Sequence, residues 1–334
     1  MELEMHGPLV GRKQNIWRLF LQQAGLEPDL SVARTALIWE DGELVAAGSR
    51  QGNLLKCIAV DPMHQGEGLT ATLITALRQD AFQEGHRHLF LYTKPGNEFQ
   101  FSSLFFYPIA KTDKVLLMES KKDGIRQFVD SLPESGSEGI VGAAVMHCNP
   151  FTLGHRYLIE TAAAECDRLY VFVLSESGST FSPEDRMAMV KAGTADLPNV
   201  IVLPTGPYLI SSATFPTYFL KEKEILPNIQ CALDIAVFSR YFAPKLHITR
   251  RYVGTEPLSP STGQYNQALK DQLPGRGIEV RELHRLEQGQ QPVSASRVRQ
   301  LLTEGREEEI GSLVPRTTLA YLREKGFLRK EDTL

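Results

Sequence analysis

Apolar residues in the second half of the chain recur in two patterns that follow one another in regular order. Short apolar runs predict buried strands, and the segments between them carry apolar residues at the three- to four-residue spacing of a helix facing a core. Strands are expected at 139–146, 168–175 and 200–206, and helices at 152–166, 182–197 and 214–226. This alternation favours a parallel sheet with crossover helices, in which ligands bind beyond the carboxyl ends of the strands.

The pattern changes toward the end of the chain. Strand-rich stretches are expected around 235–254 and 277–286, and helical spacing over 294–305 closes the region. We therefore expect the parallel sheet to gain further strands before a last helix packs on it.

The first part of the chain mixes strands and helices less regularly. The run 34–49 predicts a hairpin, because two half-apolar strands flank Asp41 and Gly42, a pair that tolerates positive φ. Further strands are expected at 53–60, 86–93 and 114–120, with a helix over 68–85 and a short helix within 97–110. Together these elements predict a mixed sheet.

A joint between the two patterns lies at 131–139, where Pro, Gly, Ser and acidic residues replace periodic spacing. A chain of 334 residues suits two domains of roughly 100 to 200 residues each. We therefore expect an α/β protein with one domain over 1–132, built on the mixed sheet, and a second over 139–334, built on the parallel sheet.

Composition narrows the range of functions. The formal charge is −4, which argues against nucleic acid or a membrane surface as a partner. No apolar run approaches the ~18 residues that span a bilayer, and the first residues lack the apolar core of a signal peptide. The four cysteines form no CxxC pair, so we expect reduced thiols and a cytoplasmic location. These cysteines are Cys57, Cys148, Cys166 and Cys231.

The first candidate site is the start of the helix after the strand at 139–146. Free N–H groups and the positive end of the helix dipole converge there, which suits an anion. Gly154 leaves room for a phosphate, Thr152 can cap the helix or bind phosphate oxygen, and His155 can donate to charge on an α-phosphate. Simple capping, with His155 as a solvated helix residue, is the alternative. The turn before the helix consists of Asn149, Pro150 and Phe151.

A second helix start has similar chemistry. Ser294 and Ser296 begin the helix at 294–305, and Arg297 and Arg299 follow within one turn. Hydroxyls, N–H groups and arginines in this arrangement can hold a polyphosphate, although an ordinary cap with solvated arginines has the same pattern.

The motif at 152–155 resembles the (H/T)xGH signature of the nucleotidyltransferase superfamily, and 293–299 resembles its distal ISSTxxR signature. The resemblance implies a Rossmann-like domain that transfers a nucleotidyl group and releases pyrophosphate without a covalent enzyme intermediate. The superfamily often carries a lysine after the second strand, whereas this chain has no Lys or Arg there until Arg186. Lys191 and Lys221 are possible substitutes.

Longer stretches resemble the C-terminal half of the citrate lyase ligases, among them 149–163, 215–226, 250–269 and 293–302. This resemblance implies that ATP, with Mg²⁺, activates acetate as acetyl-AMP. The acetyl group then passes to the thiol of the dephospho-coenzyme A-type prosthetic group on the acyl carrier subunit of citrate lyase. His155 would stabilise the α-phosphate, and pyrophosphate would leave toward Ser294, Ser296 and Arg299. A carboxylate nucleophile needs no general base.

Two further stretches are candidates for the same site. The loop at 205–218, with Ser211, Ser212, Thr214 and Thr217, is a polar candidate for the acceptor pocket or an ordinary loop and cap. Gly254, Thr255 and Glu256 leave a strand at the ligand edge and can contact nucleotide, although Glu256 equally fits a surface carboxylate.

In the first domain, the stretch 58–74 resembles the pyrophosphate-binding turn of the GCN5-related N-acetyltransferases. Gln65, Gly66 and Gly68 form a glycine-rich turn between strand and helix, and Thr70 takes the last small position of that motif. Its N–H groups can bind the pyrophosphate of a coenzyme A derivative. The resemblance predicts an acetyltransferase-like fold, and leaves open whether the domain catalyses or only binds.

Three hypotheses therefore compete. One is the acetate-activating ligase. The second is an adenylyltransferase that acts on pantetheine phosphate or nicotinamide mononucleotide. The third is a regulatory protein that binds nucleotide and coenzyme A without turnover.

Overall fold

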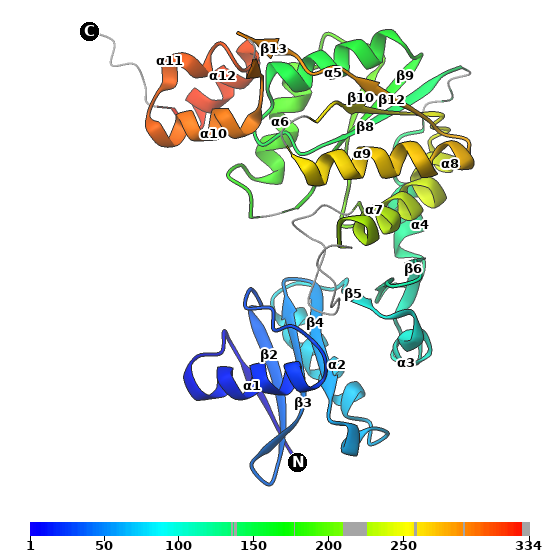
Figure 1. Cartoon of the computed structure of the whole chain (residues 1–334), viewed down its shortest axis with the longest axis vertical. Helices are drawn as coiled ribbons and strands as arrows, with labels where there is room; N and C mark the ends of the chain where they lie inside the picture. Colours follow the sequence, from blue (N-terminus) through cyan, green and yellow to red (C-terminus); the bar gives the residue numbers. More distant parts are fainter. Residues whose placement is uncertain are drawn as a thin grey trace. The chain divides into compact units, whose positions relative to one another are not determined.

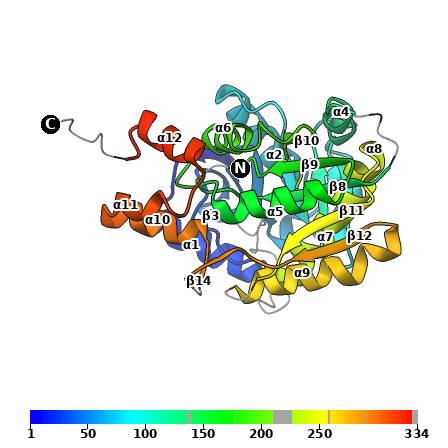
Figure 2. The same cartoon turned by 90° about the horizontal axis from the view of Figure 1, so that it is seen from above.

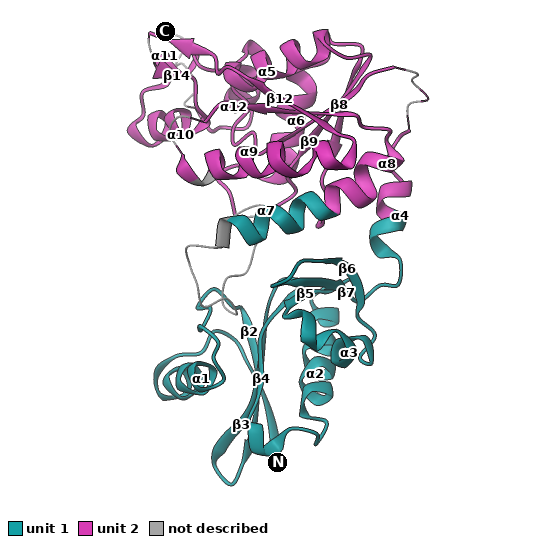
Figure 3. Cartoon of the chain, turned by 45° about the vertical axis from the view of Figure 1, so that its right-hand side comes forward, with its two compact units in different colours: residues 1–127, 215–236 teal, residues 128–214, 237–334 magenta. Residues whose placement is uncertain are grey.

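A computed structural model describes residues 1–134, 136, 139–176, 178–209, 226–256, 259–289 and 291–328 (Figure 1). The chain divides into two compact units, with 1–127 and 215–236 in unit 1 and with 128–214 and 237–334 in unit 2 (Figure 3). This grouping assigns 226–236 to unit 1, whereas the predicted domain ranges divide the chain once, between 132 and 139. The predicted ranges stay a prediction.

Unit 1 is built on a seven-stranded sheet in the order β1-β2-β3-β4-β5-β7-β6. All neighbours run antiparallel except β4 and β5, which are parallel. The predicted mixed sheet is confirmed. Its strands are β1 (Glu2–His6), β2 (Arg34–Glu40), β3 (Glu43–Gln51), β4 (Leu54–Val60), β5 (Phe90–Thr93), β6 (Tyr107–Lys111) and β7 (Leu116–Glu119).

The hairpin of unit 1 forms where the sequence predicts it. Asp41 and Gly42 connect β2 to β3 with φ values of 49° and 84°, the left-handed conformation that a tight hairpin turn requires. Leu73, Leu77 and Ala81 of α2 (Leu69–Gln83) are buried against the sheet, as their spacing predicts. The other helical segments of the unit are α1 (Gly11–Gln23), η1 (Pro62–His64), η2 (Pro95–Asn97) and α3 (Glu98–Ser102).

The parallel pair β4 and β5 is joined only at its beginning. Leu54 faces Phe90 and Leu55 faces Leu91, and no later pairing joins the two strands. On its other side β4 is bulged, since the register against β3 shifts at Cys57, whose φ is 52°. Beyond Leu55 the two strands therefore leave the sheet open between them.

Unit 2 is built on a five-stranded parallel sheet in the order β10-β9-β8-β11-β12. The strand–helix alternation predicted for 139–206 is confirmed. The strands are β8 (Val141–Met146), β9 (Arg168–Val173), β10 (Val200–Pro204), β11 (Arg250–Gly254) and β12 (Glu279–Leu283), and a two-stranded ribbon adds β13 (Glu287–Gln288) and β14 (Gln291–Pro292).

Helices α5 (Leu153–Ala164) and α6 (Pro183–Gly193) follow β8 and β9 and bury Ile159, Ala162, Met189 and Val190 in the core of the sheet. Helices α10 (Ala295–Glu304), α11 (Glu307–Ile310) and α12 (Arg316–Glu324) gather at one end of the unit (Figure 2). The remaining segments are α4 (Gly124–Asp130), α7 (Leu226–Val237), η4 (Phe238–Phe242), α8 (Ala243–Lys245), α9 (Pro260–Gln272) and η5 (Pro274–Arg276).

The strand-rich interpretation of 235–254 is wrong for its first half. Residues 235–245 are helical in α7, η4 and α8, and the strand begins only at Arg250. Leu233 and Val237 are buried four residues apart, as are Phe238 and Phe242, and the rings of Phe238 and Phe242 stack at 6.5 Å. The β-branched and aromatic composition suggested strands, whereas helical packing of these side chains determines the structure.

Two further observations concern the cysteines and the length of the helices. The cysteines are free, and Cys57, Cys148 and Cys231 are buried. No helix in the described ranges is long and apolar enough to cross a membrane.

Candidate functional site

Helix α5 begins directly after β8, at the carboxyl end of the sheet, and its first turn is closed by a capping box. Thr152 is the N-cap, with extended backbone angles, and its Oγ1 accepts a hydrogen bond from the His155 N–H at 3.4 Å. The Thr152 N–H donates in return to His155 Nδ1 at 3.1 Å. Thr152 is buried, so these two residues fix each other's position. The capping expected as an alternative is therefore present.

The cap also determines which imidazole nitrogen carries the proton. Nδ1 accepts the Thr152 N–H, so the neutral ring carries its hydrogen on Nε2. Burial, followed by the charges of Arg285 and His147, lowers the pKa of His155 to about 4. At neutral pH the ring is uncharged, and its Nε2–H is a donor at the ligand edge of the sheet. Capping and donation are therefore compatible roles of one side chain.

Gly154 is required by a neighbouring backbone. A Cβ at this position would lie 2.8 Å from the carbonyl oxygen of Val293, the residue before the cap of α10. The N–H of Leu153 donates to the carbonyl of Leu313 at 2.9 Å. The start of α5 is therefore packed closely against the segment that begins α10, so the two predicted helix starts lie together.

The turn before α5 is held in place by contacts within unit 2. Asn149 is buried and its Oδ1 accepts the Phe181 N–H at 3.1 Å, which ties the loop after β8 to the loop after β9. Phe151 is fully buried in the core and stacks on His155, with ring centroids 6.0 Å apart. Pro150 follows Asn149 through a cis peptide bond. These three residues shape the loop within unit 2.

The start of α10 combines capping with an arginine contact. Ser294 Oγ accepts the Arg297 N–H at 3.2 Å, and Ser296 is exposed. Arg299 donates to the carbonyl of Asn149 at 2.5 Å and to Ser296 Oγ at 3.0 Å. Arg297 approaches Glu309 at 3.6 Å. Arg299 thus joins the two helix starts, whereas Arg297 is paired with a glutamate on α11.

The cations considered from the sequence have other positions. Arg186 is fully buried, and its guanidinium donates to the carbonyls of His147 and Glu176. Its two contacts connect the loop after β8 to the loop after β9. Lys191 is exposed in the last turn of α6. Lys221 lies outside the described residues, as do Ser211, Ser212, Thr214 and Thr217 of the expected acceptor pocket.

The end of β11 provides a pair that the sequence analysis only half identified. Glu256 is almost buried, with its side chain 7% exposed, and forms an ion pair with Arg285. Its Oε1 accepts the Ser259 N–H at 3.1 Å. Gly254 lies tightly against Leu158, since an added Cβ would approach Leu158 Cδ1 to 3.3 Å. Glu256 is thus a partnered carboxylate, and the residue that the sequence analysis missed is Arg285.

In the part of the chain that the structure describes, no three His, Cys, Asp or Glu side chains converge on one point. Mg²⁺ commonly binds through substrate phosphates and water with few protein ligands, so a cation that arrives with a nucleotide stays a prediction.

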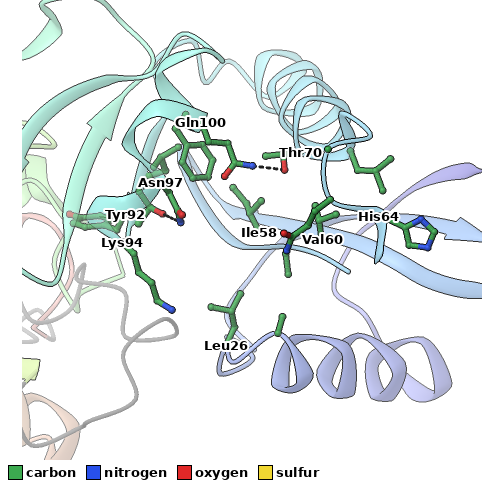
Figure 4. Close-up of a pocket in the computed structure, with 17 residues that line it drawn as sticks. Leu26, Ile58, Val60, His64, Thr70, Tyr92, Lys94, Asn97 and Gln100 are labelled. Carbon is green, nitrogen blue, oxygen red and sulfur yellow. Dashed lines mark hydrogen bonds between the residues drawn. The ribbon is translucent and has the colours of Figure 1, made fainter. Parts of the chain in front are cut away.

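A second candidate site is a cavity of about 570 Å³ in unit 1 (Figure 4). It lies where β4 and β5 part, and Ile58 and Val60 line one side while Tyr92 and Thr93 line the other. Most of the strand residues that line the cavity are apolar. Its polar groups are His64, Gln65, Thr70, Thr93, Lys94, Asn97 and Gln100.

The glycine turn predicted from the sequence borders this cavity. Gln65 and Gly66 line it, and Gly68 is the N-cap residue of α2. Gly66 and Gly68 have φ values of 92° and 78°, and a Cβ on either would meet open space. No side chain caps α2, so the first N–H groups of the helix face the turn without a side-chain partner.

Comparisons with known proteins agree with this geometry. A family model for the citrate lyase ligase C-terminal domain matches residues 141–322, and one for the acetyltransferase (GNAT) family matches 11–100. The protein is thus of a class that joins a GNAT-like mixed-sheet unit to a parallel-sheet unit whose ligand edge carries a capped histidine.

More specifically, the chain belongs to the citrate lyase ligase family. It is 43% identical over 318 residues to the [Citrate [pro-3S]-lyase] ligase of Klebsiella pneumoniae, covering 93% of this chain and 92% of that protein. It is 40% identical over 311 residues to the protein of the same name from Escherichia coli (strain K12), covering 91% and 88%. A shorter match, 43% identical over 56 residues, covers 16% of this chain and 35% of the phosphopantetheine adenylyltransferase of Staphylococcus carnosus (strain TM300).

Proposed function

We propose that the protein is an ATP-dependent ligase that activates acetate as acetyl-AMP. It then acetylates the prosthetic-group thiol on the acyl carrier subunit of citrate lyase. The observation that carries this proposal is the capped start of α5, where His155 presents a neutral Nε2–H at the ligand edge. Similarity to citrate lyase ligases over more than nine-tenths of the chain supports the choice of acceptor.

In the first step, an acetate oxygen attacks the α-phosphorus of ATP and the bond to the β-phosphate oxygen breaks. Pyrophosphate leaves with that electron pair toward Ser294, Ser296 and Arg299. His155 donates its Nε2–H to an α-phosphate oxygen, which gains charge in the transition state. Mg²⁺ bound to the polyphosphate would supply further charge neutralisation.

In the second step, the thiol sulfur attacks the acetyl carbon and AMP leaves, while the thiol proton is released. We propose that the cavity of unit 1 holds the prosthetic group. The apolar walls between β4 and β5 suit a pantetheine arm, and the free N–H groups of the turn at Gly66 and Gly68 suit its pyrophosphate. The unit would then serve to bind the carrier's thiol arm.

A second candidate function is nucleotide synthesis by adenylyl transfer to pantetheine phosphate or nicotinamide mononucleotide. The 56-residue match to a phosphopantetheine adenylyltransferase favours it. The match covers only 16% of this chain, whereas the first two ligases match more than nine-tenths of it. A regulatory protein without turnover is the third alternative.

The test is isotope exchange between ATP and pyrophosphate with the purified protein and Mg²⁺. We expect exchange that depends on acetate, and acetylation of the carrier subunit when it is added. Exchange that requires pantetheine phosphate or nicotinamide mononucleotide would establish the second function. Nucleotide binding without exchange under any of these conditions would support a regulatory role.

A further inference from the structure

Arg285 follows β12 and lies beside the start of α5. Its Cγ is 3.9 Å from the position of a Cβ on Gly254, and Leu158 Cδ1 is 3.3 Å from the same point. Leu158 and His155 are three residues apart on α5 and therefore share a face of the helix. The stem of Arg285 thus lies against the face of α5 that carries His155.

Backbone contacts tie Arg285 to the other helix start as well. The carbonyl of Leu286, the next residue, accepts the Val293 N–H at 3.0 Å. The Val293 carbonyl in turn lies against Gly154, and Ser294 follows as the cap of α10. Arg285, His155 and Ser294 come from three separate segments that meet at one place.

Arg285 forms an ion pair but keeps N–H donors that can bind a second group. Its guanidinium pairs with Glu256, which is fixed in turn by the Ser259 N–H, and its side chain remains 30% exposed. Among the described residues, no other acceptor forms a hydrogen bond with its guanidinium. A guanidinium carries five N–H donors in a planar fork, so donors are left for a second anion.

Other arginines near the loop are committed elsewhere. Arg186 is buried and bonded to two carbonyls, and Arg297 approaches Glu309. Arg299 bonds to Asn149 and Ser296 on the side of α10. Arg285, by contrast, follows the carboxyl end of β12, beyond the strand residues Arg250, Arg251 and Arg281.

We propose that Arg285 binds the polyphosphate of the nucleotide together with the start of α10, and that Glu256 is a positioning residue that orients it. This inference rests on the proposed function, since it assumes that ATP binds at the start of α5. In this proposal Arg285, after β12, neutralises the charge of the phosphates. Neither Arg186 nor Lys191 is placed to do so.

The experiment compares Arg285→Gln and Arg285→Lys with the unaltered full chain by calorimetric titration of ATP, adenosine and pyrophosphate in Mg²⁺ buffer. Loss of a charge-assisted contact should weaken ATP and pyrophosphate binding by about 10- to 100-fold in Arg285→Gln. Adenosine binding should change less than about threefold, and Arg285→Lys should recover part of the lost affinity because it keeps the charge. Arg281→Gln is the matched control, since Arg281 lies on β12 and contacts Glu165 and Glu279.

Three results would overturn the inference. The first is an Arg285→Gln protein that binds ATP and pyrophosphate normally. The second is an equal loss for ATP and adenosine, which indicates a structural role for the Glu256 pair. The third is an equal effect of Arg281→Gln.

Glu256→Gln tests whether Glu256 positions Arg285 or only stabilises the fold. If Glu256 positions Arg285, the variant binds ATP more weakly while its melting temperature stays close to that of the unaltered chain. Absence of ATP binding to the unaltered chain would instead contradict the proposed function itself.

Discussion

Helix α2 follows β4 and η1, and helix α5 follows β8, but the first turns of the two helices carry different groups. In unit 1, Gly68 caps α2 in a left-handed conformation and contributes no side chain. In unit 2, Thr152 and His155 cap α5 with each other's side chains. The first start offers bare N–H groups, and the second offers an oriented imidazole.

This difference separates binding from chemistry. The N–H groups of a glycine turn can bind any phosphate that fits between them. They do not act as an acid, a base or a nucleophile. An imidazole held by its Nδ1, with a proton on Nε2, is directed at one oxygen and can stabilise charge as it develops. We therefore expect variants at α5 to affect adenylation and variants at α2 to affect only the acceptor.

The largest effect is expected for His155→Gln. A glutamine at this position can accept the Thr152 N–H and preserve the capping box, so the helix start should keep its stability. Loss of the imidazole donor should lower acetate-dependent ATP–pyrophosphate exchange by about 100- to 1000-fold. The measurement is the exchange rate at saturating acetate, together with the melting temperature.

Thr152→Ser is the control for this prediction, because serine keeps the hydroxyl and the backbone N–H that hold His155. It should exchange at nearly the normal rate. If His155→Gln also exchanges normally, then His155 only caps the helix.

A smaller and more selective effect is expected for Gly68→Val. A valine at φ 78° strains the turn by roughly 1–2 kcal/mol and places a side chain beside the N–H groups proposed to bind the acceptor's pyrophosphate. Acetyl transfer to the carrier subunit should fall by about tenfold at subsaturating carrier, which corresponds to ~1.4 kcal/mol. ATP–pyrophosphate exchange should not change.

Gly85→Val provides a matched control at the other end of α2. Gly85 has φ 86°, and a Cβ there also meets open space, so the strain should be comparable. Both variants should lose similar stability, but only Gly68→Val should lose transfer. Equal transfer rates in the two variants would remove the turn from acceptor binding.

The sequence predicted what local rules determine. The Asp41–Gly42 hairpin, the alternation of strands and helices over 139–206 and the capped starts at Thr152 and Ser294 follow from residue types within a few positions of one another. The segment 235–245 shows the limit of this approach. It was expected to be rich in strands, whereas it is helical and buries side chains four residues apart, among them the stacked rings of Phe238 and Phe242.

What the sequence could not provide depends on contacts between distant residues. Gly154 fits the predicted phosphate approach, but its visible constraint is the carbonyl of Val293, far along the chain. In the sequence, Arg285 resembles any polar residue at the end of a strand. Its importance appears only when β11 and β12 pair and bring Glu256 beside it.

The smallest expected effect concerns the proton on His155. Its pKa is lowered to about 4 in the folded protein, by burial first and then by the charges of Arg285 and His147, whereas the unfolded ring titrates near 6.5. Between pH 6.5 and 4 the unfolded chain therefore binds more protons at this residue, so the free energy of unfolding decreases as the pH falls through that window. The contribution should be of order 1 kcal/mol, because the side chain of His155 is half-buried and solvent screens part of the effect, and it should be absent in His155→Gln. Urea unfolding of both proteins from pH 7 to pH 4 measures the difference.

In a parallel NMR titration with labelled histidine, Arg285→Gln should raise the pKa of His155, since it removes a neighbouring positive charge. A pKa for His155 near 6.5 in the unaltered protein would contradict both the buried Nδ1 contact and the approach of Arg285.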